Sequence, residues 1–126
     1  MFQIQIRRIY EEPKKTDGAR VFVDRLWARG LKKEDAELTL WMKEAAPSGE
    51  LRRWFHAHPS SFTMFADQYI QELETNPDQG AIIEKVKNLL FKGNVTLLYG
   101  SKDTLHNNAV VLQKWLDKKM QQEKNA

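Results

Sequence analysis

Residues 20–30 read Arg-Val-Phe-Val-Asp-Arg-Leu-Trp-Ala-Arg-Gly, and this stretch decides the fold. Val21, Phe22 and Val23 form a β-branched and aromatic run that predicts a buried strand. In α/β folds, ligands bind at the carboxyl ends of the strands. The run ends abruptly in an acid and two arginines, Asp24, Arg25 and Arg29, so the sequence indicates a site for an anionic group there.

Composition indicates one ordinary globular domain. The chain has 126 residues, of which 41% are hydrophobic and 29% are charged. We expect a single α/β domain over residues 1–120 and a polar C-terminal tail over 121–126. No apolar run reaches the ~18 residues of a membrane span, so we expect no membrane partner. The first eight residues alternate polar and apolar side chains, which is typical of a strand and not of a signal peptide; a cytoplasmic location is therefore expected.

The residue inventory excludes several chemistries. The chain contains no cysteine, which excludes disulfides, thiolate nucleophiles and cysteine-ligated metals. His56 and His58 are two positions apart and would point to opposite sides of an extended segment, so we expect no metal site and no cofactor. The net charge is +3, spread along the chain. Charged side chains on a solvated surface explain this charge. Binding of nucleic acid is possible, but the sequence does not indicate it.

Hydrophobic periodicity predicts four strands and three good helices. The strands are expected at about 2–10, 20–24, 38–42 and 95–99. The helices are expected from 60 or 61 to 75, from 77 to 90 and from 105 to 119, with a shorter helix capped by Ser48 and an exposed helical turn within 32–37. Asn76 is the predicted cap of the helix that begins at Pro77.

These elements predict a three-layer α/β domain with a small, largely parallel sheet flanked by helices. Strand 95–99 and the helix after it form half of a βαβ crossover, so strand 95–99 should lie parallel to a neighbour, and strand 20–24 is the expected one. The loops after Val23 and Tyr99 would then open at the same edge of the sheet and could meet over one ligand.

Four motifs, in order along the chain, resemble the YeaO-like family of short bacterial domains. They are Arg20-Val-Phe-Val-Asp-Arg-Leu-Trp-Ala-Arg-Gly-Leu, Leu40-Trp-Met-Lys-Glu-Ala-Ala-Pro-Ser, Glu50-Leu-Arg-Arg-Trp-Phe, and Thr96-Leu-Leu-Tyr-Gly-Ser-Lys-Asp with His106-Asn-Asn-Ala-Val-Val-Leu. The resemblance covers about Ile4 to Leu116. It implies a compact α/β domain and no established substrate, cofactor or mechanism.

The chain departs from the family pattern at two positions. Ala28 stands where the family usually has proline, which should make that loop less rigid. His56-Ala57-His58-Pro59 stands where the family tends toward Gly-His-Asp-Pro, so Ala57 occupies the histidine position. A longer branch of the family resembles this chain but has cysteines around residues 99–108, and their absence here excludes thiol chemistry.

Candidate site residues come from the two converging loops. Arg25 and Arg29 would clamp an anion, unless Asp24 holds them as internal ion pairs. Ser101, Lys102 and His106 would add donors at the start of the last helix, although Asp103 or Thr104 could instead cap that helix and leave His106 solvated. Lys43 could point into the same cleft or lie in solvent.

We expect these residues to bind a phosphorylated or carboxylated small molecule. If the protein is an enzyme, Asp24 or His106 would move the proton, and hydrolysis or group transfer is the simplest reaction without a cofactor. The alternative is a non-catalytic binding or regulatory module that recognises nucleic acid or a protein through a basic surface bearing Trp27.

Overall fold

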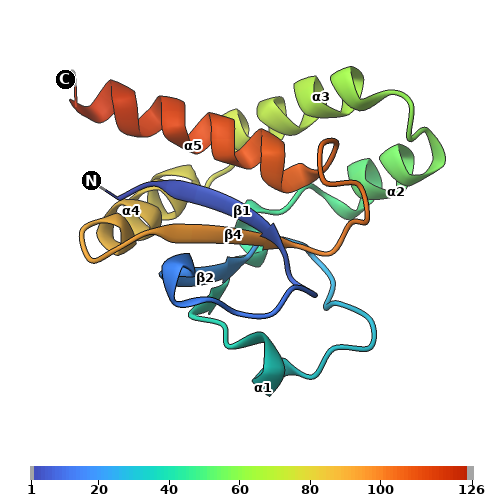
Figure 1. The fold of residues 1–126 in the computed structure, drawn as a ribbon. Helices are drawn as coiled ribbons and strands as arrows, with labels where there is room; N and C mark the ends of the chain where they lie inside the picture. The colour runs from blue at the N-terminus through green and yellow to red at the C-terminus, as the bar shows by residue number, and fades with distance from the viewer. Residues whose placement is uncertain (1, 125–126) are drawn as a thin grey trace.

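A four-stranded sheet, parallel throughout, forms the centre of the molecule (Figure 1). The computed structural model describes residues 2–124. The strand order is β1-β4-β2-β3, and the strands are β1 (Ile4–Arg8), β2 (Ala19–Phe22), β3 (Leu40–Trp41) and β4 (Val95–Tyr99). The predicted α/β class with a small parallel sheet is confirmed.

Strand β4 lies inside the sheet, and all five of its residues are buried. On one side it pairs with β1, where Ile4 is opposite Val95. On the other side it pairs with β2, where Val21 is opposite Leu97. The predicted adjacency of residues 95–99 and 20–24 is therefore confirmed.

The third strand is shorter than the sequence predicted. Only Leu40 and Trp41 pair with β2 as a strand. The ladder is prolonged by two further backbone hydrogen bonds, from the Thr39 N–H to the Arg20 carbonyl and from the Met42 N–H to the Phe22 carbonyl, both 2.8 Å. The chain then turns into a short 3-10 segment, Lys43–Ala45, which ends the alternation of the strand.

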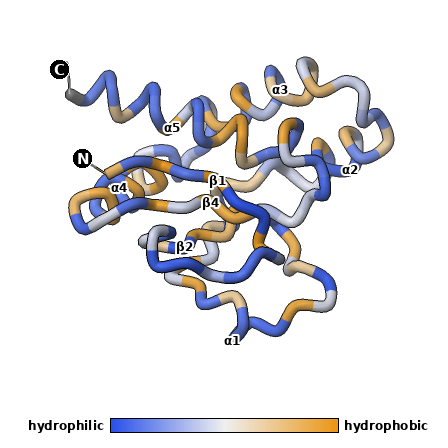
Figure 2. Tube along the Cα trace, in the orientation of Figure 1, coloured by the Kyte–Doolittle hydropathy of each residue, from blue (hydrophilic) through white to orange (hydrophobic). Residues whose placement is uncertain are grey.

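The four long helices cover one face of the sheet. They are α2 (Gly49–Ala57), α3 (Phe62–Thr75), α4 (Gln79–Leu90) and α5 (Asn108–Lys124). Their apolar residues share one core cluster with Val21, Val95 and Leu97. Along α3 and α5 the hydropathy alternates between hydrophobic and hydrophilic, as expected for helices with one buried face (Figure 2).

The opposite face has a thinner cover. The segment between β2 and β3 crosses it, and this segment contains the short helix α1 (Lys33–Ala36) (Figure 1). Here Phe22 and Leu98 pack in a second, smaller core cluster with Ile9, Ala28 and Ala36. The two outer layers of the domain are thus unequal, with helices on one face and mostly loop on the other.

Local hydrogen bonds set the helix starts. The Ser48 Oγ accepts from the Leu51 N–H, as predicted for the cap of α2. Asn76 was predicted to cap the next helix at Pro77, but its Oδ1 accepts from the Asp78 N–H in a turn, and α4 begins at Gln79.

Helix α5 also differs from its predicted bounds of 105–119. It begins at Asn108 because the Asp103 carboxylate binds the N–H groups of Leu105 and His106 in a turn, and because the Asn107 Oδ1 accepts from the Val110 N–H. The helix continues to Lys124, so residues 121–124 of the expected tail are helical, and residues 125–126 lie outside the described residues.

A buried ionic cluster holds the amino-terminal ends of β2 and β4 together. The Asp17 carboxylate, 1% exposed, accepts from the Arg7 Nη1 at 2.7 Å and from the Arg20 Nη1 at 2.5 Å. The Asp17 carbonyl accepts from the Thr96 Oγ1 of β4 at 2.7 Å. Gly18 has a φ of +64°, and a Cβ there would lie 2.0 Å from the Asn94 carbonyl oxygen, so only glycine fits this turn.

The charge of Asp17 is stabilised by its partners. Burial alone would raise the pKa of Asp17, but the Lys14 N–H and the Arg7 and Arg20 guanidiniums outweigh burial and lower the pKa below its ordinary value of 3.8. The ionised carboxylate is therefore the form that the fold requires.

Replacing Asp17 should destabilise the fold strongly. Asp17→Asn keeps the shape but removes the counter-charge of the buried Arg20 and leaves Arg7 paired only with the exposed Glu11. We expect a loss of about 3–5 kcal/mol in the free energy of unfolding, measured by urea denaturation. Asp67→Asn, at an exposed position of α3, removes the same charge and should change it by less than about 0.5 kcal/mol. Equal stabilities of the two variants would show that the cluster adds nothing.

The same cluster predicts acid sensitivity. Because the pKa of Asp17 is lowered in the folded state, its stabilising contribution is complete above the unfolded value of 3.8 and is lost as the pH falls through the folded pKa. The difference in unfolding free energy between the wild type and Asp17→Asn should therefore shrink below about pH 3.8. A difference that is constant from pH 7 to pH 3 would contradict this assignment.

Candidate functional site

A crevice forms where the chain leaves β2 and β4 in opposite directions. After β2 the chain crosses the face that contains Phe22 and Leu98, whereas after β4 it leads into α5 on the face that contains Val21 and Leu97 (Figure 1). In open parallel sheets, ligands bind in the crevice that such a divergence leaves at the carboxyl ends of the strands. The candidate site lies at this point.

Asp24 joins the two diverging strands. Its Oδ2 accepts a hydrogen bond of 2.9 Å from the Gly100 N–H, and its Oδ1 accepts one of 3.0 Å from the Asn108 Nδ2. The Asn108 Nδ2 also donates to the Val23 carbonyl at 3.1 Å. A Cβ at position 100 would lie 3.1 Å from the Asp24 Oδ2, so glycine allows this close approach. The carboxylate thus links the end of β2, the end of β4 and the start of α5.

The environment of Asp24 acts on its charge in two directions. Burial raises the pKa of Asp24 above its ordinary value, while the Asn108 and Gly100 donors and the positive charge of Arg52 oppose this rise. The net direction is upward. The carboxylate is held by neutral donors and lacks the two guanidinium partners that stabilise Asp17.

A hollow of about 700 Å³ opens beside Asp24, within the size range of small-molecule sites. The side chains around it come from the loop after β2, from α2 and the segments on either side of it, from α3, and from the loop before α5 together with the first residue of that helix. They are Asp24, Arg25, Pro47, Arg52, Phe55, His56, Pro59, Phe65, Ser101, Lys102, Asp103, His106, Asn107 and Asn108.

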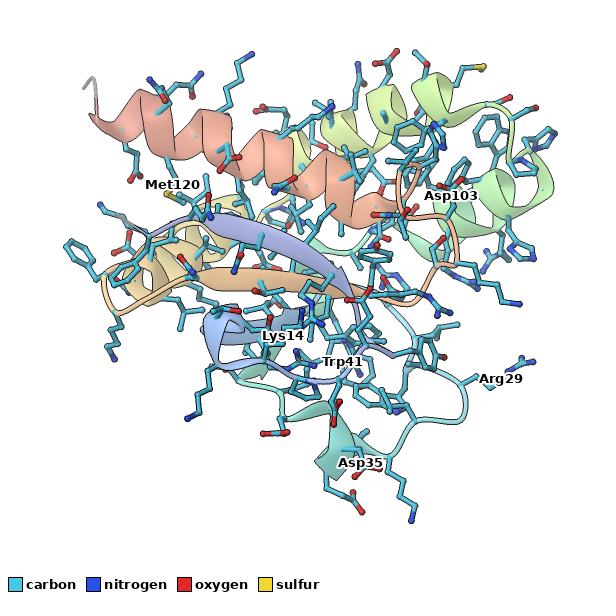
Figure 3. All side chains as sticks on the ribbon, in the orientation of Figure 1. Lys14, Arg29, Asp35, Trp41, Asp103 and Met120 are labelled. Carbon is cyan, nitrogen blue, oxygen red and sulfur yellow. The ribbon has the colours of Figure 1, made fainter. Side chains whose placement is uncertain are left out.

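The structure brings most of the predicted site residues together. Asp24, Arg25, Ser101, Lys102 and His106 all line the hollow. Figure 3 shows Asp103 at the same loop, between α5 and α2.

Arg29 and Lys43 lie outside this lining. Arg29 is exposed and projects outward from the loop after β2 (Figure 3), and its carbonyl accepts from the Tyr10 hydroxyl at 2.7 Å. The Lys43 Nζ lies 4.0 Å from the centroid of the Trp41 ring, because the chain turns into the 3-10 segment after β3.

Three cationic side chains at the hollow have no carboxylate partner in the part of the chain that the structure describes. The Arg25 Nε donates to the Pro47 carbonyl at 3.0 Å. Among residues 2–124, no ion pair involves Arg25, Arg52 or Lys102. The internal ion pair between Asp24 and the arginines, which the sequence left open, is therefore not formed. Arg7 and Arg20, by contrast, are both paired with Asp17.

Asp24 and His106 do not form the hydrogen-bonded pair that proton transfer between them would need. The His106 Nδ1 lies 3.1 Å from the Asp103 Oδ2, and its ring meets Phe62 edge-to-face at 5.1 Å. Asp24 is bound instead by Gly100 and Asn108. The separation follows from the turn at Asp103, which holds His106 before α5 begins.

Trp27 does not offer an open ring for base stacking. Its ring packs edge-to-face on Phe22 at 5.1 Å and against Trp41 at 5.3 Å. Its Nε1 donates to the Leu31 carbonyl at 2.7 Å. The indole is half-buried and anchors the loop that covers this face of the sheet.

Sequence reasoning missed the contribution of α2. Arg52, Phe55 and His56 line the hollow, yet the sequence indicated no site role for Arg52 or Phe55 and suggested His56 only as a poor metal ligand. Their spacing of three and four positions places them on one face of a helix, and this signal could have grouped them. It could not show that the face turns toward the sheet edge.

The described residues, 2–124, contain no group of three or more His, Cys, Asp or Glu side chains suited to a metal ion. Within the same range, every helix is too short or too polar to cross a membrane.

The fold and the hollow together define a class of protein, a small parallel α/β protein with a cation-lined crevice at the carboxyl edge of its sheet. The family model described as the inactive DUF488-N3 subclade matches residues 3–126, and the chain belongs to this family. It is 42% identical to the uncharacterized protein YeaO of Escherichia coli K12 over 113 residues, which cover 90% of this chain and 96% of YeaO. The predicted YeaO-like membership is confirmed.

A mycobacterial relative is also similar over nearly the whole chain. The uncharacterized protein Rv3073c of Mycobacterium tuberculosis is 36% identical over 115 residues, which cover 91% of this chain and 94% of the relative. No solved structure matches the chain.

The link through Asp24 can be tested by removing its charge. Both partners of the carboxylate are donors, so Asp24→Asn would place an amide N–H against one of them. We expect the free energy of unfolding to fall by about 1–3 kcal/mol in urea denaturation. Asp35→Asn, at an exposed position of α1, serves as the matched control and should leave the midpoint of the urea denaturation curve unchanged. A stable Asp24→Asn protein would mean that the two strand ends are held by other contacts.

Proposed function

We propose that this protein binds an anionic small molecule, phosphorylated or carboxylated, in the hollow beside Asp24. Arg25, Arg52 and Lys102 would hold the anionic group. The observation that carries the proposal is that three cations from three separate parts of the chain line one concave site and have no carboxylate partner among residues 2–124. Unpaired arginine and lysine side chains that converge in this way suit phosphate and carboxylate groups.

The geometry favours binding over catalysis. Asp24 already accepts hydrogen bonds from Gly100 and Asn108, and His106 is paired with Asp103, so neither is poised against the other as an acid–base pair. The family model is described as an inactive subclade, which agrees with a role in binding or sensing. We therefore do not assign a hydrolase or transferase activity to the hollow.

A small molecule is also favoured over nucleic acid. Binding of single strands relies on aromatic rings that are open to stacking next to basic residues. Trp27 was the residue suited to that role, and its ring is packed against Phe22 and Trp41. The cations that remain unpaired at the crevice line a concave site instead of an extended groove.

Inorganic phosphate is the simplest probe of the proposal. At a concentration ten times its Kd, a ligand that binds only the folded state adds about 1.4 kcal/mol to the stability, which raises the melting temperature by several degrees. We expect such a rise with phosphate at constant ionic strength, and the Lys102→Gln variant should reduce it at least threefold.

Lys92→Gln is the matched control for this experiment, because Lys92 is exposed and does not line the hollow. It should respond to phosphate as the wild type does. If phosphate has no effect on the wild type, or if both lysine variants respond equally, anion binding in the hollow is refuted.

A further inference from the structure

We infer that the natural ligand carries its anionic group on a short linker to a flat ring, as a nucleoside monophosphate does. This inference rests on the proposed function, since it concerns the same hollow, and it adds the chemistry of the part that is not anionic. Three features of the hollow lead to this inference: its size, its aromatic wall and the spacing between that wall and Arg52 along α2.

The hollow is far larger than an inorganic anion requires. Its volume is about 700 Å³, whereas an oxyanion displaces only a few waters of ~30 Å³ each. Pockets of ~300–1,000 Å³ are typical for ligands with many more atoms. A bare phosphate or carboxylate would fill only a small part of this space, so the hollow has room for a larger molecule that carries the anionic group.

One wall of the hollow is aromatic and fixed. Phe55 of α2 stacks on Phe65 of α3, with ring centroids 4.2 Å apart and an angle of 16° between the planes. Phe65 is fully buried in the core, so it holds the half-buried Phe55 in one orientation. Pro59 and the His56 ring line the same side of the site. Because Phe55 is itself packed against Phe65 and, at 5.9 Å, Phe62, the exposed His56 ring and Pro59 are the flat surfaces left to pack against a ring of the ligand, and Phe55 supports them from below.

The sequence spacing along α2 places the aromatic wall next to the cationic side chain of Arg52. Arg52 precedes Phe55 by three positions and His56 by four, so the three side chains lie on one face of the helix, with their Cβ atoms roughly 5–6 Å apart. The side chains that would hold the anion and the ring therefore leave α2 about one helical turn, ~5.4 Å, from each other on the same face. A linker of the size of a pentose spans this separation.

The carboxylates of the hollow suit such a linker. Asp24 and Asp103 line the site beside the cations. Each carboxylate has about four acceptor positions. Hydroxyl groups of a sugar can therefore donate to them, while a second anionic group would be repelled. Three cationic side chains against two carboxylates leave room for one anionic group, which favours a monophosphate over a triphosphate.

The experiment compares four probes that differ by one part at a time. Inorganic phosphate, ribose 5-phosphate, adenosine 5′-monophosphate and uridine 5′-monophosphate are titrated into the full-length protein by calorimetry at one ionic strength. We expect both nucleotides to bind at least tenfold more tightly than ribose 5-phosphate. If all four probes bind with equal affinity, the inference about the ring is wrong and the proposed anion site stands. If none of them binds, the proposed function itself fails.

Two pairs of variants locate the effect on α2. His56→Ala should reduce the ratio of nucleotide to ribose 5-phosphate affinity at least threefold, whereas His58→Ala should leave it unchanged, because His58 stacks on Trp54 outside the hollow. Arg52→Gln should weaken all four probes by the same factor. Arg53→Gln, at the next position of the helix, should weaken none.

A third variant separates ring packing from any other role of His56. Phe55→Leu keeps the apolar volume but removes the flat ring, and it is measured at a temperature where its circular dichroism matches that of the wild type. We expect the affinity ratio to fall here as well. A ratio that stays at the wild-type value in both His56→Ala and Phe55→Leu overturns the inference.

Discussion

The carboxylate of Asp24 is the constraint on which the candidate site depends. Strands β2 and β4 are hydrogen-bonded neighbours, but beyond their carboxyl ends the chain diverges to opposite faces of the sheet. The hydrogen bonds that Asp24 accepts from the Gly100 N–H and the Asn108 Nδ2 hold the two exits together. Arg25 and the loop 101–106 follow directly from these fixed points, so the position of the hollow is a consequence of this link.

The buried Asp17 and the half-buried Asp24 mark two different ends of the sheet, one closed by ion pairs and one open to solvent. At the amino ends of the strands, the Asp17 carboxylate accepts hydrogen bonds from Arg7, Arg20 and the Lys14 N–H, so both of these guanidiniums are already paired with a carboxylate. At the carboxyl ends, Asp24 is held by neutral donors, and the cations around it keep no carboxylate partner within the described residues. The ion pairs of Asp17 therefore make the amino ends of the strands structural, while the unpaired cations at the carboxyl ends are available to bind a ligand.

Prediction from the sequence succeeded where the signal is local. The run Val95–Tyr99 predicted a buried strand, and Ser48 predicted a helix cap, because each depends on a few neighbouring residues. Prediction of element boundaries from the sequence failed where side chains compete for the same backbone groups. The Asp103 carboxylate binds two N–H groups and delays α5 to Asn108. Lys43 leaves the crevice because the chain turns into a 3-10 segment after β3.

The sequence alone determined the α/β class, the adjacency of residues 20–24 and 95–99, and the convergence of their exit loops, because hydrophobic periodicity and the topology of parallel strands encode all three. Only the tertiary structure decided which charges are paired, that α2 closes the hollow with Arg52 and Phe55, and that Asp24 binds Asn108 instead of His106. These facts depend on distances between segments far apart in the chain, and such distances are set by packing and not by any local pattern.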